Sequence, residues 1–179
     1  MDTSHHDFEL KGEMEESYES LLENYKRLPE RLEAVIAGLD KSDLDLRKGD
    51  EWSIREYICH LVEGEQLWQV NLRMILGLNG AEFPMTWYPK HSQLEWAECW
   101  AYDKRCLQVL LDQYRADTQY LVDILKNLPD AVWEHYGRIT WPGYKEESRY
   151  SVRDIVEMHL NHLDGHAEDI RAIRALHGC

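Results

Sequence analysis

Apolar residues recur at helical spacing in four stretches of the chain. In residues 13–39 the apolar stripe predicts a first helix that is kinked or restarted at Pro29, because proline lacks the backbone N–H donor. Similar periods predict a second helix from Ser53 to about residue 78, a third over residues 94–128 and a fourth from Ser151 onward. The fold class predicted by this pattern is all-α.

Two of the expected helices begin with the same pattern. The hexapeptides EWSIRE at residues 51–56 and RYSVRD at residues 149–154 each place a serine three residues before an acid. That spacing is typical of a capping box, in which the two side chains satisfy free N–H groups of the first helical turn. Both helices carry histidines, so we expect them to hold equivalent places in a bundle.

The segments between the helices differ in character. Residues 40–51 are polar connecting sequence, whereas residues 79–93 and 129–150 combine prolines with tryptophans and tyrosines. Long loops are often functional, so we expect these two aromatic segments to be irregular crossovers that form pocket walls. Residues 1–13 are expected to be a flexible N-terminal tail, and residues 14–179 a single domain.

Three histidines fall on the inward faces of the second and fourth helices. His162 and His166 lie one turn apart among apolar residues of the fourth helix, and His60 shares a face with apolar residues of the second. A buried imidazole needs a hydrogen-bond partner or a metal ion. They are therefore either hydrogen-bonded core residues or a three-histidine site for zinc, nickel, copper or iron with an open position for water or substrate. Their origin in two separate helices favours the metal site.

Two further residues are candidates for secondary roles at such a site. His159 is also inward and could replace one of the ligands or hydrogen-bond to one. Glu63 lies three residues after His60 and is a candidate carboxylate near the metal, although a solvated surface position is the commoner role for glutamate. The sequence has no GxSxG motif, no H-E-x-x-H motif and no glycine-rich phosphate loop, so the catalytic residues stay unknown.

Composition narrows the class of partner. The formal net charge of -14 over 179 residues disfavours binding to nucleic acid, because an acidic surface repels phosphates. No apolar run is long enough to span a membrane, and no signal peptide is evident at the N-terminus. The four cysteines form no CxxC pair and no disulfide framework, which indicates reduced thiols and a cytoplasmic location.

The histidine-bearing segments resemble a known family. WSIREYICH in the second helix and NHLDGHAEDIRAIR in the fourth are similar to motifs of the DinB/YfiT-like metalloprotein superfamily, and the resemblance covers about residues 14–177. It implies a bacterial four-helix bundle with long crossover loops, which carries a divalent metal, most often nickel or zinc, on His60, His162 and His166. It also implies a homodimer.

The resemblance suggests a function as well. Some members are thiol-dependent transferases or isomerases that use bacillithiol or mycothiol, so we expect a metal-dependent thiol transferase or isomerase that acts on a small molecule with a low-molecular-weight thiol as cosubstrate. The alternative is a non-catalytic metal-binding or stress-associated dimeric helical bundle. A closed, structural metal site would favour this alternative, and an open coordination position favours the enzyme.

Overall fold

The computed structural model describes residues 16–140 and 148–179, and the predicted tail at residues 1–13 lies outside them. The main elements follow one another along the chain as α1 (Tyr18–Lys26), α2 (Leu28–Ile36), α3 (Ile54–Gly77), β1 (Ala81–Pro84), α4 (Gln93–Cys99), α5 (Leu107–Leu125), β2 (Tyr136–Thr140), β3 (Ser148–Ser151) and α6 (Val152–His177).

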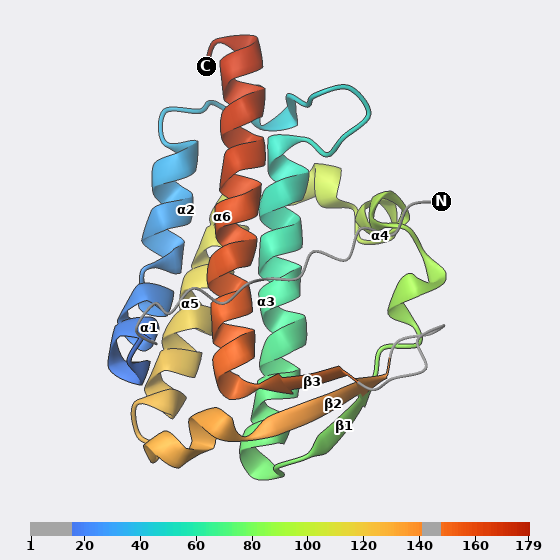
Figure 1. Cartoon of the computed structure of the whole chain (residues 1–179). Helices are drawn as coiled ribbons and strands as arrows, with labels where there is room; N and C mark the ends of the chain where they lie inside the picture. The colour runs from blue at the N-terminus through green and yellow to red at the C-terminus, as the bar shows by residue number, and fades with distance from the viewer. Residues whose placement is uncertain (1–15, 141–147) are drawn as a thin grey trace, which may run out of the picture.

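These helices form a four-helix bundle in which α1 and α2 together make one of the four columns (Figure 1). The column formed by α1 and α2 packs against α5 and α6, and α3 packs against the same two helices from the other side. Both α3 and α5 run toward the end of the bundle that carries the small sheet, so a long crossover connects these parallel neighbours. The predicted fold class is confirmed. None of the described helices is long and apolar enough to cross a membrane.

The helix starts follow the sequence signals. The first predicted helix is divided at Arg27, and Pro29 lies in the first turn of α2, where a missing N–H costs little. Ser53 with Glu56 and Ser151 with Asp154 both form complete capping boxes at the starts of α3 and α6. The equivalent starts that we predicted for the two histidine-bearing helices are confirmed.

The prediction of one continuous helix over residues 94–128 is wrong. The chain forms α4, then turns at Ala101, whose φ of 51° is left-handed, and starts α5 only at Leu107. Tyr102 follows the turn and is almost fully buried, and its carbonyl accepts a weak hydrogen bond from the Cys59 thiol of α3. Burial of Tyr102 in the core compensates for the unfavourable backbone conformation of Ala101. The spacing of apolar residues alone does not reveal that the helix is interrupted here.

The two aromatic crossovers also contain structure that the sequence did not predict. β1 pairs in parallel with β2, and β2 pairs antiparallel with β3, so the segments 79–93 and 129–150 meet in a three-stranded sheet (Figure 1). The strands are four or five residues long, which is too short to give a clear alternating pattern. Residues 141–147 of the second crossover lie outside the described residues.

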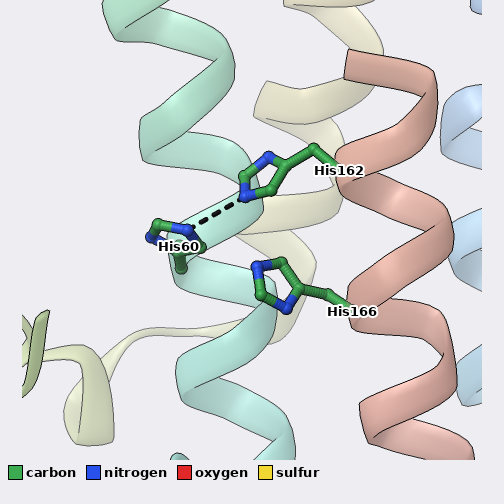
Figure 2. Close-up of side chains that lie close together, drawn as sticks. All are labelled: His60, His162 and His166. Atoms are coloured by element: carbon green, nitrogen blue, oxygen red, sulfur yellow. Dashed lines mark hydrogen bonds between the residues drawn. The ribbon is translucent and has the colours of Figure 1, made fainter. Parts of the chain in front are cut away.

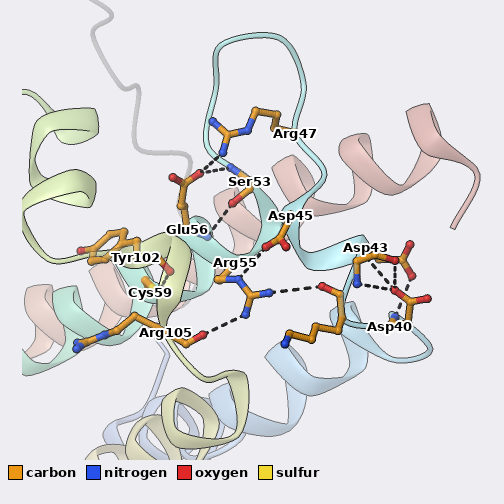
Figure 3. A network of polar contacts seen from close by, with 12 residues as sticks. Asp40, Asp43, Asp45, Arg47, Ser53, Arg55, Glu56, Cys59, Tyr102 and Arg105 are labelled. Atoms are coloured by element: carbon orange, nitrogen blue, oxygen red, sulfur yellow. Dashed lines mark hydrogen bonds and ion pairs between the residues drawn. The ribbon is translucent and has the colours of Figure 1, made fainter.

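A buried arginine joins the polar loop before α3 to the crossover before α5 (Figure 3). Arg55 donates to the Asp45 carboxylate at 2.9 Å, to the Arg105 carbonyl at 3.0 Å and to the Lys41 carbonyl at 3.5 Å. Glu56, which caps the helix, also pairs with Arg47 at 3.3 Å. These contacts position the segment after α4 against α3, near the turn that carries His60.

Candidate metal centre

The three predicted histidines converge at the packed faces of α3 and α6 (Figure 2). His60 lies in the second turn of α3, and His162 and His166 lie one turn apart in the middle of α6. Nε2 of His60 and Nε2 of His162 are 3.0 Å apart. The ligand atoms of all three residues lie within 4.8 Å of one another, and among the described residues no other histidine, cysteine or acid belongs to such a group.

This donor set fits a divalent transition metal. Zinc binds imidazole nitrogen at about 2.0–2.1 Å, which places neighbouring nitrogens roughly 2.8 to 3.4 Å apart in octahedral or tetrahedral geometry. The pair His60 and His162 already has that separation, and the ligand atom of His166 lies within 4.8 Å of theirs. Three imidazoles leave at least one coordination position for another ligand, as in catalytic zinc sites. Metal binding by these residues stays a prediction.

The surroundings keep two of the imidazoles neutral, which is the form that binds metal. Burial, followed by repulsion from His162 and His166, lowers the pKa of His60 to about 3. Burial, followed by repulsion from His166 and His159, lowers the pKa of His162 to about 4. Protons therefore compete only weakly with a metal ion at these two residues at neutral pH.

The same shifts predict how the stability of the metal-free protein depends on pH. In the unfolded chain His60 and His162 titrate near pH 6.5. Below that pH the unfolded chain binds protons that the folded protein does not bind, because the pKa values of both histidines are lower in the folded state. Stability is therefore expected to fall as the pH drops from about 6.5 toward 4, by up to about 1.4 kcal/mol per pH unit for each histidine.

Urea denaturation of chelator-treated protein between pH 7 and pH 4.5 measures this fall. The His60→Gln, His162→Gln double variant is the control, because it keeps every other titrating group. Equal slopes for the two proteins would contradict the prediction.

Asp169 is a residue of the site that sequence reasoning missed. Its carboxylate lies 3.0 Å from Nδ1 of His166, one turn away on α6. A proton on Nδ1 that is donated to Asp169 leaves Nε2 of His166 as the free lone pair for a metal. The signal was present in the sequence, because an acid three residues after a histidine lies on the same helical face.

Removing this carboxylate is expected to weaken metal binding. Asp169→Ala frees the His166 ring to rotate and to change tautomer, and loss of such a partner costs about 10- to 100-fold in affinity. Asp169 is about half exposed, so we expect the lower end of that range. Competition with a chromophoric chelator measures the affinity. Glu168→Ala, at the neighbouring exposed acid, is the control. An equal loss of metal affinity in both variants would show a general effect of charge and not a role of Asp169.

Gly64 makes room for one of the imidazoles. A Cβ at this position of α3 would lie 3.2 Å from Cε1 of His162 and 3.7 Å from Nδ1. Gly64→Ala is therefore expected to displace His162 and to weaken metal binding about fivefold, the equivalent of about 1 kcal/mol of side-chain strain. The exchange also favours the helix by about 1 kcal/mol, so the metal-free protein should not lose stability.

Gly165→Ala on α6 is the matched control, because nothing lies within 4 Å of its added Cβ. We expect it to gain helix stability without any change in metal affinity. Chelator competition and thermal melting of both variants measure the two effects separately. Unchanged metal affinity in Gly64→Ala would contradict the role given to this glycine.

His159 lies outside the three-histidine group and belongs to a polar network in the core. Its Nδ1 lies 3.0 Å from the Glu65 carboxylate, and both side chains are almost completely buried. Glu65 also accepts hydrogen bonds from the Tyr25 hydroxyl and from Gln69, whose amide donates in turn to the Asp117 carbonyl. The alternative in which His159 replaces a ligand is therefore not supported by the geometry.

The neighbours of Glu65 favour the ionised form of its carboxyl. Burial by itself raises the pKa of the carboxyl, but the charge of His159 and the hydrogen bonds from His159, Tyr25 and Gln69 together lower it below its ordinary value. The carboxylate thus stays ionised in the core because its partners donate the hydrogen bonds that water would otherwise donate.

Glu63 is partly exposed and forms an ion pair on the flank of α3. It pairs with Arg105 at 2.7 Å and lies outside the group of ligating side chains. Glu63 is therefore not one of the ligating residues, although it lines a hollow together with His60. Its flank of α3 faces the crossover segment that ends at Arg105, and this arginine comes close only because the predicted third helix is broken.

Two adjoining hollows open beside His60. The smaller has a volume of about 250 Å³ and is lined by His60, Glu63, Gly64, Gln66, Leu67, Trp87, Tyr88, Trp100 and Tyr102. The larger has a volume of about 400 Å³ and is lined by His60, Gly64, Leu67, Trp68, Met85, Tyr88, Met158, Asn161 and His162. The crossover at 79–93 contributes pocket walls as predicted, whereas no described residue of 129–150 lines either hollow.

Comparison with known proteins agrees with this architecture. A family model of the DinB superfamily matches residues 24–170. The structure is similar to that of YfiT from Bacillus subtilis, described as a probable metal-dependent hydrolase with an unusual four-helix bundle topology, with a TM-score of 0.76 and 15% sequence identity over 94% of this chain and 93% of that one. The search of curated proteins finds no match.

The fold and the histidine cluster thus define a helical bundle with a candidate transition-metal centre. Because the family model spans most of the chain, the protein belongs to the DinB superfamily.

Proposed function

We propose that this protein is a divalent-metal-dependent enzyme that transfers a low-molecular-weight thiol to a small-molecule electrophile, or uses it in an isomerisation. His60, His162 and His166 hold the ion, which is nickel or zinc. The observation that carries the proposal is the convergence of three imidazoles beside two hollows, of which the smaller is lined by His60 and the larger by His60 and His162. A structural site would instead be closed by a fourth protein ligand.

The chain supplies binding and orientation for this chemistry. When bound, the ion lowers the pKa of a thiol or water and polarises a carbonyl. His60 and His162 present neutral nitrogens because burial disfavours their charged forms, and Asp169 orients His166. The larger hollow is lined by both His60 and His162, so a substrate held there would lie beside two of the three residues that would hold the ion.

A panel assay tests the proposal. Protein purified without an affinity tag is loaded with zinc or nickel and mixed with one low-molecular-weight thiol and 1-chloro-2,4-dinitrobenzene as electrophile. We expect metal-dependent conjugation, saturable in both substrates, that is lost in His162→Ala and retained in His177→Ala, an exposed histidine of the same helix. Turnover that is absent with every thiol, or independent of metal, would contradict the proposal.

Hydrolysis is a second candidate, supported by the similarity to YfiT, a probable metal-dependent hydrolase, and by a three-histidine site that would leave a position for water. Assays with esters and amides in place of the thiol and electrophile distinguish the two, because hydrolysis needs no thiol. If the protein binds metal but turns over neither class, the alternative of a non-catalytic metal-binding or stress-associated bundle is favoured.

The proposal includes a setting for the enzyme. We place it in the bacterial cytoplasm as a homodimer that acts on small molecules and binds neither nucleic acid nor membrane. Support comes from the net charge of -14 and from four cysteines that are all free in the structure. Sedimentation of the metal-loaded protein tests the dimer.

A further inference from the structure

Five aromatic rings from the crossover and α4 form a cluster beside the candidate metal centre. Trp96 is the centre of the cluster, with the Trp100 ring stacked at 4.8 Å, the Tyr88 ring stacked at 5.9 Å and the Trp87 ring edge-on at 5.5 Å between centroids. Tyr102 continues the row, 6.0 Å from Trp100. Four of the five, all except Trp96, line the smaller hollow.

The cluster is held in place although only Tyr102 of its five rings belongs to the buried core. Trp87, Tyr88, Trp96 and Trp100 all keep part of their surface accessible, and Trp87 is 39% exposed. The indole N–H of Trp96 donates to the Tyr88 carbonyl at 2.8 Å, which joins the loop to α4. Large aromatic surface that is ordered but left accessible beside a pocket indicates a binding site.

The carboxylate and the amide that line the same hollow are already paired. Glu63 is neutralised by Arg105 at 2.7 Å, and Gln66 donates to Asp117 at 3.2 Å. A ligand therefore finds aromatic faces and the side chain of Leu67, without an uncompensated charge to bind. Aromatic walls with a free carboxylate would suit a cation, whereas these walls suit a neutral group.

The volume limits the size of that group. A cavity of about 150 Å³ holds benzene. The hollow here measures about 250 Å³, which suits one or two fused rings with a small substituent. Its wall at His60 is shared with the larger hollow, so a ring in the aromatic hollow can direct a substituent toward the histidine cluster.

We propose that the smaller hollow, lined by Trp87, Tyr88, Trp100 and Tyr102, is a subsite for a neutral planar aromatic group of one or two rings. As a statement about substrate, this rests on the proposed function: the ring belongs to the molecule that reacts at the metal, and the larger hollow takes the second reactant. As a statement about binding it stands without any turnover.

Binding of 2-naphthol, a neutral two-ring probe, tests the subsite. We expect calorimetry of the zinc-loaded full chain to give one site with a dissociation constant on the order of 0.1 mM. Trp100→Ala is expected to weaken binding about tenfold, because the ring loses one aromatic face. Tyr120→Ala is the control, since Tyr120 is an exposed aromatic residue of α5 that lines neither hollow. If Trp100→Ala does not fold, Trp87→Ala replaces it, because its side chain is the most exposed of the five.

Three results would overturn the proposal. The first is that 2-naphthol does not bind, and the second is that tetramethylammonium binds more tightly than 2-naphthol. The third is that 2-naphthol binding is weakened by Trp68→Ala, a change in the larger hollow, but not by Trp100→Ala. Repeating the 2-naphthol titration on His162→Ala separates the subsite from the proposed function, because this variant is expected to lose turnover while the lining of the smaller hollow is unchanged. Probe binding without turnover would contradict only the enzyme, and turnover without probe binding would contradict only the subsite.

Discussion

His162→Ala is expected to abolish stoichiometric metal binding. The wild-type protein, purified without a tag and loaded with zinc or nickel, should retain about one ion per chain after dialysis, and the variant should retain almost none. Loss of a partner that only orients a ligand costs about 10- to 100-fold in metal affinity, so loss of the ligand itself should cost roughly 100-fold or more. His162 is the member of the set whose Nε2 lies 3.0 Å from that of His60.

The effect should also be visible in stability. A ligand that binds only the folded state at 1,000 times its dissociation constant stabilises it by about 4 kcal/mol. We therefore expect added metal to raise the melting temperature of the wild type and to leave that of His162→Ala unchanged. The metal-free forms should melt at similar temperatures, because the substitution removes a partly exposed ring from the wall of a hollow.

His177→Ala is the control for His162→Ala. His177 lies in the last turn of α6 and is exposed, with its ring nitrogen 3.0 Å from the Arg47 carbonyl. Elemental analysis and thermal melting of the three proteins give the comparison. If His162→Ala holds as much metal as the wild type, the three-histidine site is refuted, and the histidines are hydrogen-bonded residues of the helix interface.

The second large effect is expected in the core. Glu65→Ala should destabilise the protein by about 3–5 kcal/mol, because it leaves the buried His159 and Tyr25 without their shared partner. That loss is a large part of the 5–15 kcal/mol by which proteins are typically stable. The carboxylate links α1 through Tyr25, α6 through His159 and, by way of Gln69, the α5 carbonyl of Asp117.

Glu63→Gln is the matched control for Glu65→Ala. Glu63 lies two residues away on the same helix, and its pair with Arg105 is partly exposed, so breaking it should cost at most about 1 kcal/mol. Urea denaturation of the metal-free proteins separates this effect from metal binding. A cost below about 1 kcal/mol for Glu65→Ala would show that the network does not hold the four columns together.

The sequence was sufficient for the helices that carry the histidines. Apolar spacing placed His60, His162 and His166 on inward faces, and the capping pairs of Ser53 and Ser151 located both helix starts. Helical periodicity and capping are local properties, which depend on residues within one or two turns, so they can be read without knowledge of the fold.

Some of the remaining site residues also have a local signal in the sequence. Glu65 occupies a core position of α3, four residues before buried Gln69 and seven before buried Leu72, and this spacing predicts a buried carboxylate that needs a partner. Asp169 follows His166 at helical spacing. Neither signal identifies the partner by itself, because Tyr25 is 40 residues away from Glu65 in the chain.

The sequence by itself determined an all-α chain with two equivalent capped helices and inward histidines. Only the tertiary structure decided that the stretch 94–128 breaks at Ala101, that two crossovers pair in a sheet, and that Glu63 binds Arg105 while His159 binds Glu65. The physical reason is the range of the interactions. Helix starts and faces depend on near neighbours, whereas burial of Tyr102, strand pairing and ion pairing depend on surfaces that meet only after the bundle has formed.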